Sequence, residues 1–261
     1  MNWCSLAIFF SIFPGIGIAQ QEILLGNPCG TMDSAWLDPL NFTENPAVIT
    51  NITSSQVGVF VGRYKDIKGL NFLSAGYAMP FKNLSLGLIA FHTGTSGYQE
   101  NEINLLLAKN LGNVNIGVMC KTELISVQSF GVYKSIQIGV GVTRNFGPLV
   151  LGCSIGEIGL KKAEGIAQQF KGFKVSSQCL YRISNLVSVA ILGSKQPGQL
   201  ISIQPAIYYR TGVINCSLGF DSSGGNVFIL TGWIFKGYEV KMILGYQPIL
   251  GLIHGVEFLH K

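Results

Sequence analysis

The sequence has 261 residues, of which 48% are hydrophobic and only 12% are charged, and its formal net charge is +5. Its mean hydropathy of +0.40 is high for a water-soluble domain, yet beyond residue 20 no apolar run approaches the roughly 18–20 residues that a membrane helix needs. The composition therefore excludes a helical membrane protein, and without a basic cluster the positive charge does not indicate a nucleic-acid partner. An apolar chain of this kind predicts a large β structure with much apolar surface.

The first 19 residues, MNWCSLAIFFSIFPGIGIA, form a separate apolar and uncharged element. Gly17-Ile18-Ala19 is a small-x-small cleavage site, so residues 1–19 are interpreted as a secretory signal peptide. The alternative is a buried apolar strand or an anchor. Five cysteines remain after cleavage, and because none has CxxC spacing, neither a disulfide framework nor a zinc site is expected.

Period-2 alternation is the main signal in the rest of the chain. In SIQIGVGVT, Ile136, Ile138 and Val140 share one face, whereas Gln137 and Gly139 share the other. The same pattern predicts about fourteen strands, with twelve as an alternative, at 55–63, 69–80, 83–92, 99–109, 113–123, 133–144, 148–157, 172–182, 185–194, 199–209, 212–221, 225–235, 238–246 and 250–260.

Short and long connections alternate between these strands. About ten residues at a tilt near 40° span roughly 25 Å, the height of the apolar band of an outer-membrane barrel. Closure also removes the unpaired sheet edges that lipid does not tolerate. The prediction is an all-β fold, a closed antiparallel transmembrane β-barrel in the outer membrane of a Gram-negative bacterium. A secreted, water-soluble β-sandwich that binds a partner gives the same alternation and is kept as an alternative.

One basic residue lies beside each short turn. These residues recur at intervals of 26 to 38 positions and are Lys82, Lys109, Arg144, Arg182, Arg210 and Lys236. We expect them at the periplasmic rim, where their stems lie along the apolar wall and their charged ends meet lipid phosphates. The alternative is that charge collects at any hairpin end.

The segment WLDPLNFTENPAVITNITSSQVGVFV carries the triplet Asn45-Pro46-Ala47 just before the first expected strand. It is followed by GLNFLSAGYAMPFKNLSLGLIAFHTG and SGYQENEINLLLAKNLGNVNIGV, and HGVEF lies near the end of the chain. This order resembles the FadL-like outer-membrane barrels of the Bacteroidota, of the PorV/PorQ type, with the PorP/SprF type as second choice.

The resemblance implies a barrel over residues 55–261 and an N-terminal hatch over residues 20–54 that fills part of the lumen. It also implies two roles. PorV-like relatives are accessory or partner-binding subunits of type IX secretion or of a surface complex, and this is the first expectation, with protein partners and outer-membrane lipid. FadL-like relatives carry hydrophobic small molecules through the barrel wall, which is the alternative.

No motif places a nucleophile beside a base, so we expect no enzyme, no catalytic residue, no cofactor and no resident metal. Glu100 and Glu102 share one face at the expected outer mouth, where paired acids either form a solvated rim or bind a cation. The inward-facing charges at strand spacing are Lys121, Glu123, Glu239 and Lys241. These charges either pair to pin a hatch or act as a filter. Residues 156–172 show helical spacing, which predicts a short amphipathic helix over the mouth.

Overall fold

The computed structural model describes residue 32 and residues 38–67, 69–129, 131–163, 169–248 and 250–261. The expected signal peptide, and the part of the expected hatch that precedes residue 38 apart from Met32, lie outside the described residues.

Nearly all of the described chain is β structure, which follows from the alternating apolar residues and from turn residues between them. Two short 3₁₀ helices, η3 (Pro39–Asn41) and η4 (Pro46–Asn51), precede the strands. The strands are β1 (Gln56–Tyr64), β2 (Asn71–Phe81), β3 (Leu84–Gly94), β4 (Tyr98–Asn110), β5 (Val114–Val127), β6 (Gly131–Phe146), β7 (Leu149–Ala163), β8 (Gln169–Lys171), β9 (Lys174–Arg182), β10 (Val187–Lys195), β11 (Ser202–Arg210), β12 (Ile214–Asp221), β13 (Asn226–Phe235), β14 (Tyr238–Gln247) and β15 (Gly251–His260).

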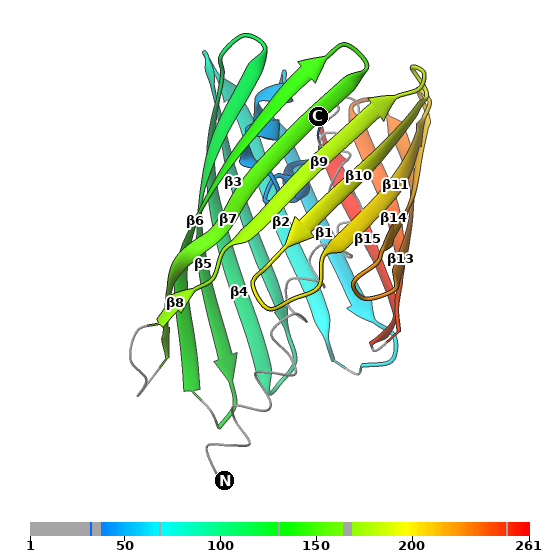
Figure 1. Ribbon diagram of the computed structural model, residues 1–261. Coiled ribbons are helices and arrows are strands. Elements are labelled where there is room, and N and C mark those ends of the chain that lie inside the picture. Colours follow the sequence, from blue (N-terminus) through cyan, green and yellow to red (C-terminus); the bar gives the residue numbers. More distant parts are fainter. Residues whose placement is uncertain (1–31, 33–37, 68, 130, 164–168, 249) are drawn as a thin grey trace.

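The strands form one closed antiparallel barrel (Figure 1). Each wall strand pairs with its neighbours in the sequence, β7 pairs with β9 past the short β8, and β1 pairs with β15 to close the wall. Within the described residues the wall therefore has fourteen strands, which confirms the larger of the two expected numbers. The short turns include glycines at positive φ, such as Gly147 (φ 66°) and Gly237 (φ 84°), because a tight hairpin needs this backbone conformation.

The apolar side of the wall faces outward. On β6, Ile136, Ile138 and Val140 are 60%, 55% and 47% exposed, whereas Gln137 is 1% exposed on the inner face. A sandwich would bury the isoleucines between two sheets, so the alternative of a soluble β-sandwich is wrong. An apolar outer surface on a closed barrel is the arrangement that lipid requires, and the protein is an outer-membrane β-barrel.

The helix expected over residues 156–172 is not formed in the described part of this segment. β7 continues to Ala163 and pairs along the extended β6, and β8 then pairs with β7. Backbone pairing with β6 satisfies more hydrogen-bonding groups than an isolated helix of one or two turns, so the strand outweighs the helical spacing.

The segment before β1 lies inside the barrel, near the end that carries the short turns (Figure 1). Here η3 packs against β1 and β2, and η4 packs against β4, β5 and β6. We call residues 38–52 the hatch segment. No helix among the described residues is long and apolar enough to cross a membrane.

Candidate functional site

Asn45 fixes the hatch segment to the wall. It is the N-cap of η4, where its Oδ1 accepts a hydrogen bond from Ala47 N at 3.1 Å. Its Nδ2 donates to the Val142 carbonyl at 3.2 Å and to Gln178 Oε1 at 3.3 Å. One amide thus caps a helix and joins it to strands of the wall, a double role for which an asparagine at an N-cap is well suited.

Inward-facing glycines make room for the hatch segment. A Cβ atom on Gly117 would lie 2.4 Å from Ala47 N, and one on Gly141 would lie 2.1 Å from Asn45 Oδ1. These contacts are too close for any side chain, so the triplet Asn45-Pro46-Ala47 rests directly on the backbone of β5 and β6.

A buried ion triad holds the other end of the hatch segment, and we call it the latch. Lys241 Nζ donates to Asp38 Oδ2 at 2.7 Å and to Glu257 Oε1 at 2.9 Å. Asp38 belongs to the hatch segment, whereas Lys241 and Glu257 are opposite one another on β14 and β15. All three are at most 3% exposed, so the latch is a desolvated ion network in which the loss of Lys241 leaves two buried carboxylates without a cation.

The ionised form of Asp38 is favoured in the latch. Burial by itself would raise the pKa of Asp38, but the charge of Lys241 and the hydrogen bonds with Glu257, Lys241 and the Leu40 N–H outweigh this effect. The pKa of Asp38 therefore lies below its ordinary value, and the carboxylate keeps its charge at neutral pH.

A second ion pair secures the middle of the hatch segment. Lys174 Nζ on β9 lies 3.1 Å from both carboxylate oxygens of Glu44, and Ser154 Oγ donates to the Glu44 carbonyl at 2.7 Å. The hatch segment is thus joined to opposite sides of the lumen.

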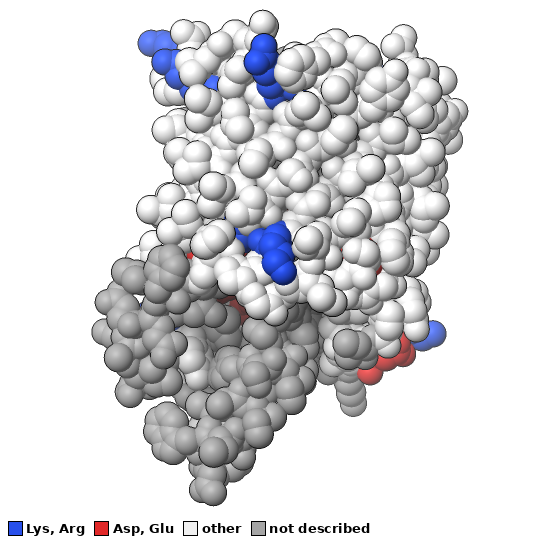
Figure 2. All heavy atoms as spheres, viewed as in Figure 1, with Lys and Arg blue, Asp and Glu red and all other residues white. Residues whose placement is uncertain are grey.

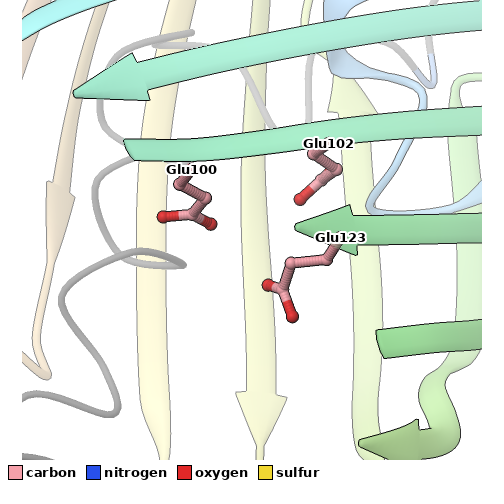
Figure 3. Close-up of side chains that lie close together, drawn as sticks. All are labelled: Glu100, Glu102 and Glu123. Atoms are coloured by element: carbon pink, nitrogen blue, oxygen red, sulfur yellow. The ribbon is translucent and has the colours of Figure 1, made fainter. Parts of the chain in front are cut away.

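Three glutamates gather on the inner face of β4 and β5, and we call them the acidic cluster. Glu100, Glu102 and Glu123 offer carboxylate oxygens that lie within 4.8 Å of one another, and Figure 3 shows the three side chains pointing into one space. Each is at most 5% exposed. They are therefore buried in the lumen wall, and the expectation of a solvated rim for Glu100 and Glu102 is wrong.

The acidic cluster is surrounded by hydrogen-bond donors. Tyr98 OH donates to Glu100 at 2.7 Å, Asn104 Nδ2 to Glu102 at 2.6 Å, and Ser135 Oγ to Glu123 at 2.8 Å. Lys121 forms an ion pair with Glu102. Glu102 and Glu123 are direct cross-strand partners, a pairing of like charges that is unfavourable unless another group compensates it.

The remaining charges that the sequence singled out lie in two places. Glu239 is buried on the inner face and pairs with Lys261 at 3.0 Å. Of the basic residues beside the short turns, Arg182 and Arg210 are half-buried, whereas Lys82, Lys109, Arg144 and Lys236 are exposed. Lys82, Arg144 and Lys236 each lie over the ring of a neighbouring phenylalanine, at 5.7, 4.8 and 5.2 Å from its centre.

Figure 2 shows the resulting charge pattern on one face of the molecule. Basic side chains lie at the end with the short turns, and a broad uncharged band separates them from charged side chains nearer the other end. This is the pattern of a wall that crosses the apolar core of a membrane.

The apolar outer surface is hollowed over β2 to β6. A cavity of about 600 Å³ is lined by outward side chains that include Tyr77, Leu88 and Leu105, and its floor includes Gly87 and Leu106. Gly87 has the hatch segment directly behind it, because a Cβ there would lie 2.6 Å from Ile49 Cδ1. We call this cavity the wall groove.

Sequence reasoning missed the partners of these charges. The sequence placed Lys121 on the inner face without naming its partner, and the ion pair forms with Glu102 on the neighbouring strand. Glu257 lies on the inward face of β15 together with Leu259, so alternation was a signal that could have found it. Nothing in the sequence connects Asp38 with Lys241, which are 203 residues apart.

The comparisons with known proteins agree on the fold. No family model matches the sequence, and no curated protein matches it. A solved structure of a TodX monoaromatic hydrocarbon channel mutant is similar, with a TM-score of 0.59, 7% identity, and coverage of 85% of this chain and 93% of that one.

Two further structures are similar. They are the Pseudomonas putida toluene transporter TodX, with a TM-score of 0.58, 9% identity and coverage of 82% and 90%, and the Acinetobacter baumannii outer membrane protein Omp33, with a TM-score of 0.54, 6% identity and coverage of 80% and 97%. At this level of identity the likeness shows a shared fold.

Proposed function

We propose that this outer-membrane barrel is a FadL-like passive transporter, which lets small apolar molecules cross through the wall beside the hatch segment. The observation that carries the proposal is the position of the wall groove, because only Gly87 separates its floor from Ile49 of the hatch segment. In this proposal the protein binds and releases its cargo without catalysis.

The size and chemistry of the wall groove support this proposal. A volume of about 600 Å³ lies within the range of small-molecule pockets, and such pockets are mostly apolar. An apolar molecule gains free energy when it leaves water for such a surface. The hatch segment occupies the lumen at the short-turn end and obstructs passage along the barrel axis, so the proposed exit is through the wall beside it.

Apolar side chains also line part of the inner face of the wall near the wall groove. Phe72, Phe91 and Ile89 are buried on the inner face of β2 and β3, two of the strands that carry the wall groove. The two TodX structures, described as a monoaromatic hydrocarbon channel and a toluene transporter, suggest monoaromatic hydrocarbons as the first cargo to test.

The test is uptake of radiolabelled toluene by a Gram-negative host that lacks its own channel for hydrophobic compounds. Leu105→Trp fills the wall groove from the lipid side and is expected to lower uptake several-fold. The matched control is Ile207→Trp, which adds the same ring to an exposed, outward-facing position on β11 and should leave uptake unchanged. Equal uptake in both variants, or none above the empty-vector host in the unsubstituted protein, would rule out this route.

A PorV-like accessory role is the second candidate, and one observation favours it. Leu200 and Ile201 are 82% and 62% exposed in the connection between β10 and β11. This connection is on the long-loop side, where an apolar tip is suited to contact a protein partner. Co-purification with type IX secretion components that is lost in Leu200→Ser would support this role, whereas co-purification that is unaffected would argue against this loop as the contact.

A further inference from the structure

We infer that the outer surface of the wall carries a binding site for a phosphate-bearing lipid of the outer leaflet, at the seam where β1 closes the barrel against β15. The site is a second hollow, of about 260 Å³, lined by residues of β1, β2, β14 and β15, and we call it the seam groove. The wall groove lies over β2 to β6, so this inference is independent of the route proposed through it.

Polar and apolar side chains lie in separate rows across the seam groove. Arg63 on β1 is the cross-strand partner of Asn71 on one side and of His254 on the other. Val61 and Val256 form the next outward pair toward the short-turn end, and all five residues line the groove. The seam groove thus has a polar end and an apolar end, as a site for the headgroup and chain of one lipid requires.

The polar row lies at the end of the barrel that carries the long connections. Arg63 is the last residue but one of β1, and Asn71 is the first residue of β2. Barrels of this kind have short periplasmic turns and longer extracellular loops, so the polar row is at the level of the outer-leaflet headgroups. This leaflet consists largely of a phosphorylated glycolipid in Gram-negative bacteria, and that lipid is the expected occupant.

His254 holds the guanidinium of Arg63 by one edge and leaves its other edge for a ligand. Arg63 Nε donates a hydrogen bond to His254 Nε2 at 2.9 Å. The two terminal amino groups of a guanidinium match two oxygens of one phosphate. No carboxylate in the described part of the chain forms an ion pair with Arg63, so these amino groups are available to an anion from the membrane.

The neighbouring charges also favour an anion. Lys65 follows Arg63 at same-face spacing and is exposed. The carboxylate beside it, that of Asp66, accepts a hydrogen bond from the Leu252 N–H at 3.2 Å. Among the described residues from 63 to 71, two basic side chains therefore stand against one acidic side chain.

The seam groove has a firm floor. Gly62 and Gly255 are opposite one another and line its base, and a Cβ on either would lie within 2.5 Å of the Phe60 ring on the inner face. The hollow is smaller than pockets that enclose a whole small molecule, so it suits part of an acyl chain. Burial of this part adds to the charge-assisted hydrogen bonds of the phosphate.

Native mass spectrometry of the detergent-purified protein tests the inference, with diphosphorylated lipid A as the probe and its dephosphorylated form as the matched lipid. We expect a saturable complex with the phosphorylated lipid. The dephosphorylated lipid should bind at least about tenfold more weakly, because it lacks the hydrogen bonds to a charged group. Inorganic phosphate at millimolar concentration should not displace the lipid, because it has no chain to fill the groove.

Two substitutions separate the charge of Arg63 from its orientation. Arg63→Gln removes the charge and should weaken binding of the phosphorylated lipid about tenfold, without changing binding of the dephosphorylated lipid. His254→Ala keeps the charge but releases the guanidinium, and it should weaken binding less. Lys134→Gln is the matched control, because Lys134 is exposed near the same end of the barrel but lies on β6, away from the seam. Heat-modifiable migration confirms that each variant is folded.

The inference is overturned if the phosphorylated and dephosphorylated lipids bind equally well, or if inorganic phosphate displaces the lipid. It is also overturned if Arg63→Gln and Lys134→Gln weaken binding alike, because the lipid then responds to the overall charge of the barrel. If Arg63→Gln does not fold, the comparison of His254→Ala with Lys134→Gln decides in the same way.

Discussion

Two buried lysines lie in the same lumen and have different surroundings. Lys241 contacts Asp38 and Glu257, so in the latch two carboxylates share one ammonium. Lys121 forms an ion pair with Glu102, one of the three glutamates of the acidic cluster. The latch includes a residue of the hatch segment, whereas every member of the acidic cluster belongs to the wall. The latch thus has a clear structural role, which is to join the hatch segment to the wall.

The comparison is informative because both groups are desolvated to the same degree. A buried ion network is retained when it fixes one part of a structure against another, or when it serves a ligand. The latch meets the first condition, since it joins the hatch segment to β14 and β15. The described contacts of the acidic cluster join neighbouring strands, which backbone hydrogen bonds already hold together.

The largest loss of stability is expected from Lys241→Met, which leaves Asp38 and Glu257 buried without their cation. Breaking a buried ion network in this way costs about 3–5 kcal/mol of unfolding free energy. Urea unfolding in lipid vesicles, followed by tryptophan fluorescence, measures the loss.

The charge-free variant Asp38→Asn/Lys241→Met/Glu257→Gln is the control for this prediction. It removes the whole network, and we expect it to recover most of the lost stability. If Lys241→Met unfolds at the same urea concentration as the unsubstituted protein, the latch does not hold the hatch segment.

An intermediate loss of stability is expected at the inward-facing glycines that make room for the hatch segment. Gly141→Ala places a Cβ 2.1 Å from Asn45 Oδ1, and overpacking of this kind costs about 1–3 kcal/mol. Because the strain acts on the hatch segment, hydrogen exchange of the Val48 N–H, which is bonded to the Asn45 carbonyl, should become faster. Gly156→Ala is the control, since nothing lies within 4 Å of its added Cβ, and an equal change there would contradict the prediction.

The smallest effect is expected from the basic residues beside the short turns, and it concerns the attraction of the protein to anionic lipid. Replacing Lys82, Arg144 and Lys236 by Gln should remove about 1 kcal/mol per charge of the attraction to an anionic leaflet. Binding of phosphatidylglycerol, added to neutral phosphatidylcholine vesicles, is measured as a shift in the thermal midpoint. Lys134→Gln, an exposed lysine near the opposite end of β6, should not change this shift. If the triple variant and Lys134→Gln respond alike, the charges at the short turns are only polar hairpin ends.

Much of the wall could be predicted from the sequence alone. Alternation in runs such as SIQIGVGVT placed Ile136 and Ile138 outward and Gln137 inward, and the turn residues set the number of strands. These features are local, because successive side chains of a strand point to opposite faces and a hairpin pairs residues that are close in the sequence. The same logic failed at residues 156–172, where pairing with β6 decided the structure.

The interior depended on contacts that no local pattern encodes. The sequence showed the charges Lys121, Glu123, Glu239 and Lys241, and it showed the triplet at Asn45. Only closure of the barrel brought Asp38 to Lys241, and only the register between β4 and β5 set Glu102 against Glu123. The reason is physical. Backbone geometry fixes the face of the strand on which a side chain lies, and this is a local property. Burial removes water from all inward charges, so each charge pairs with an opposite charge that the closed wall places within reach.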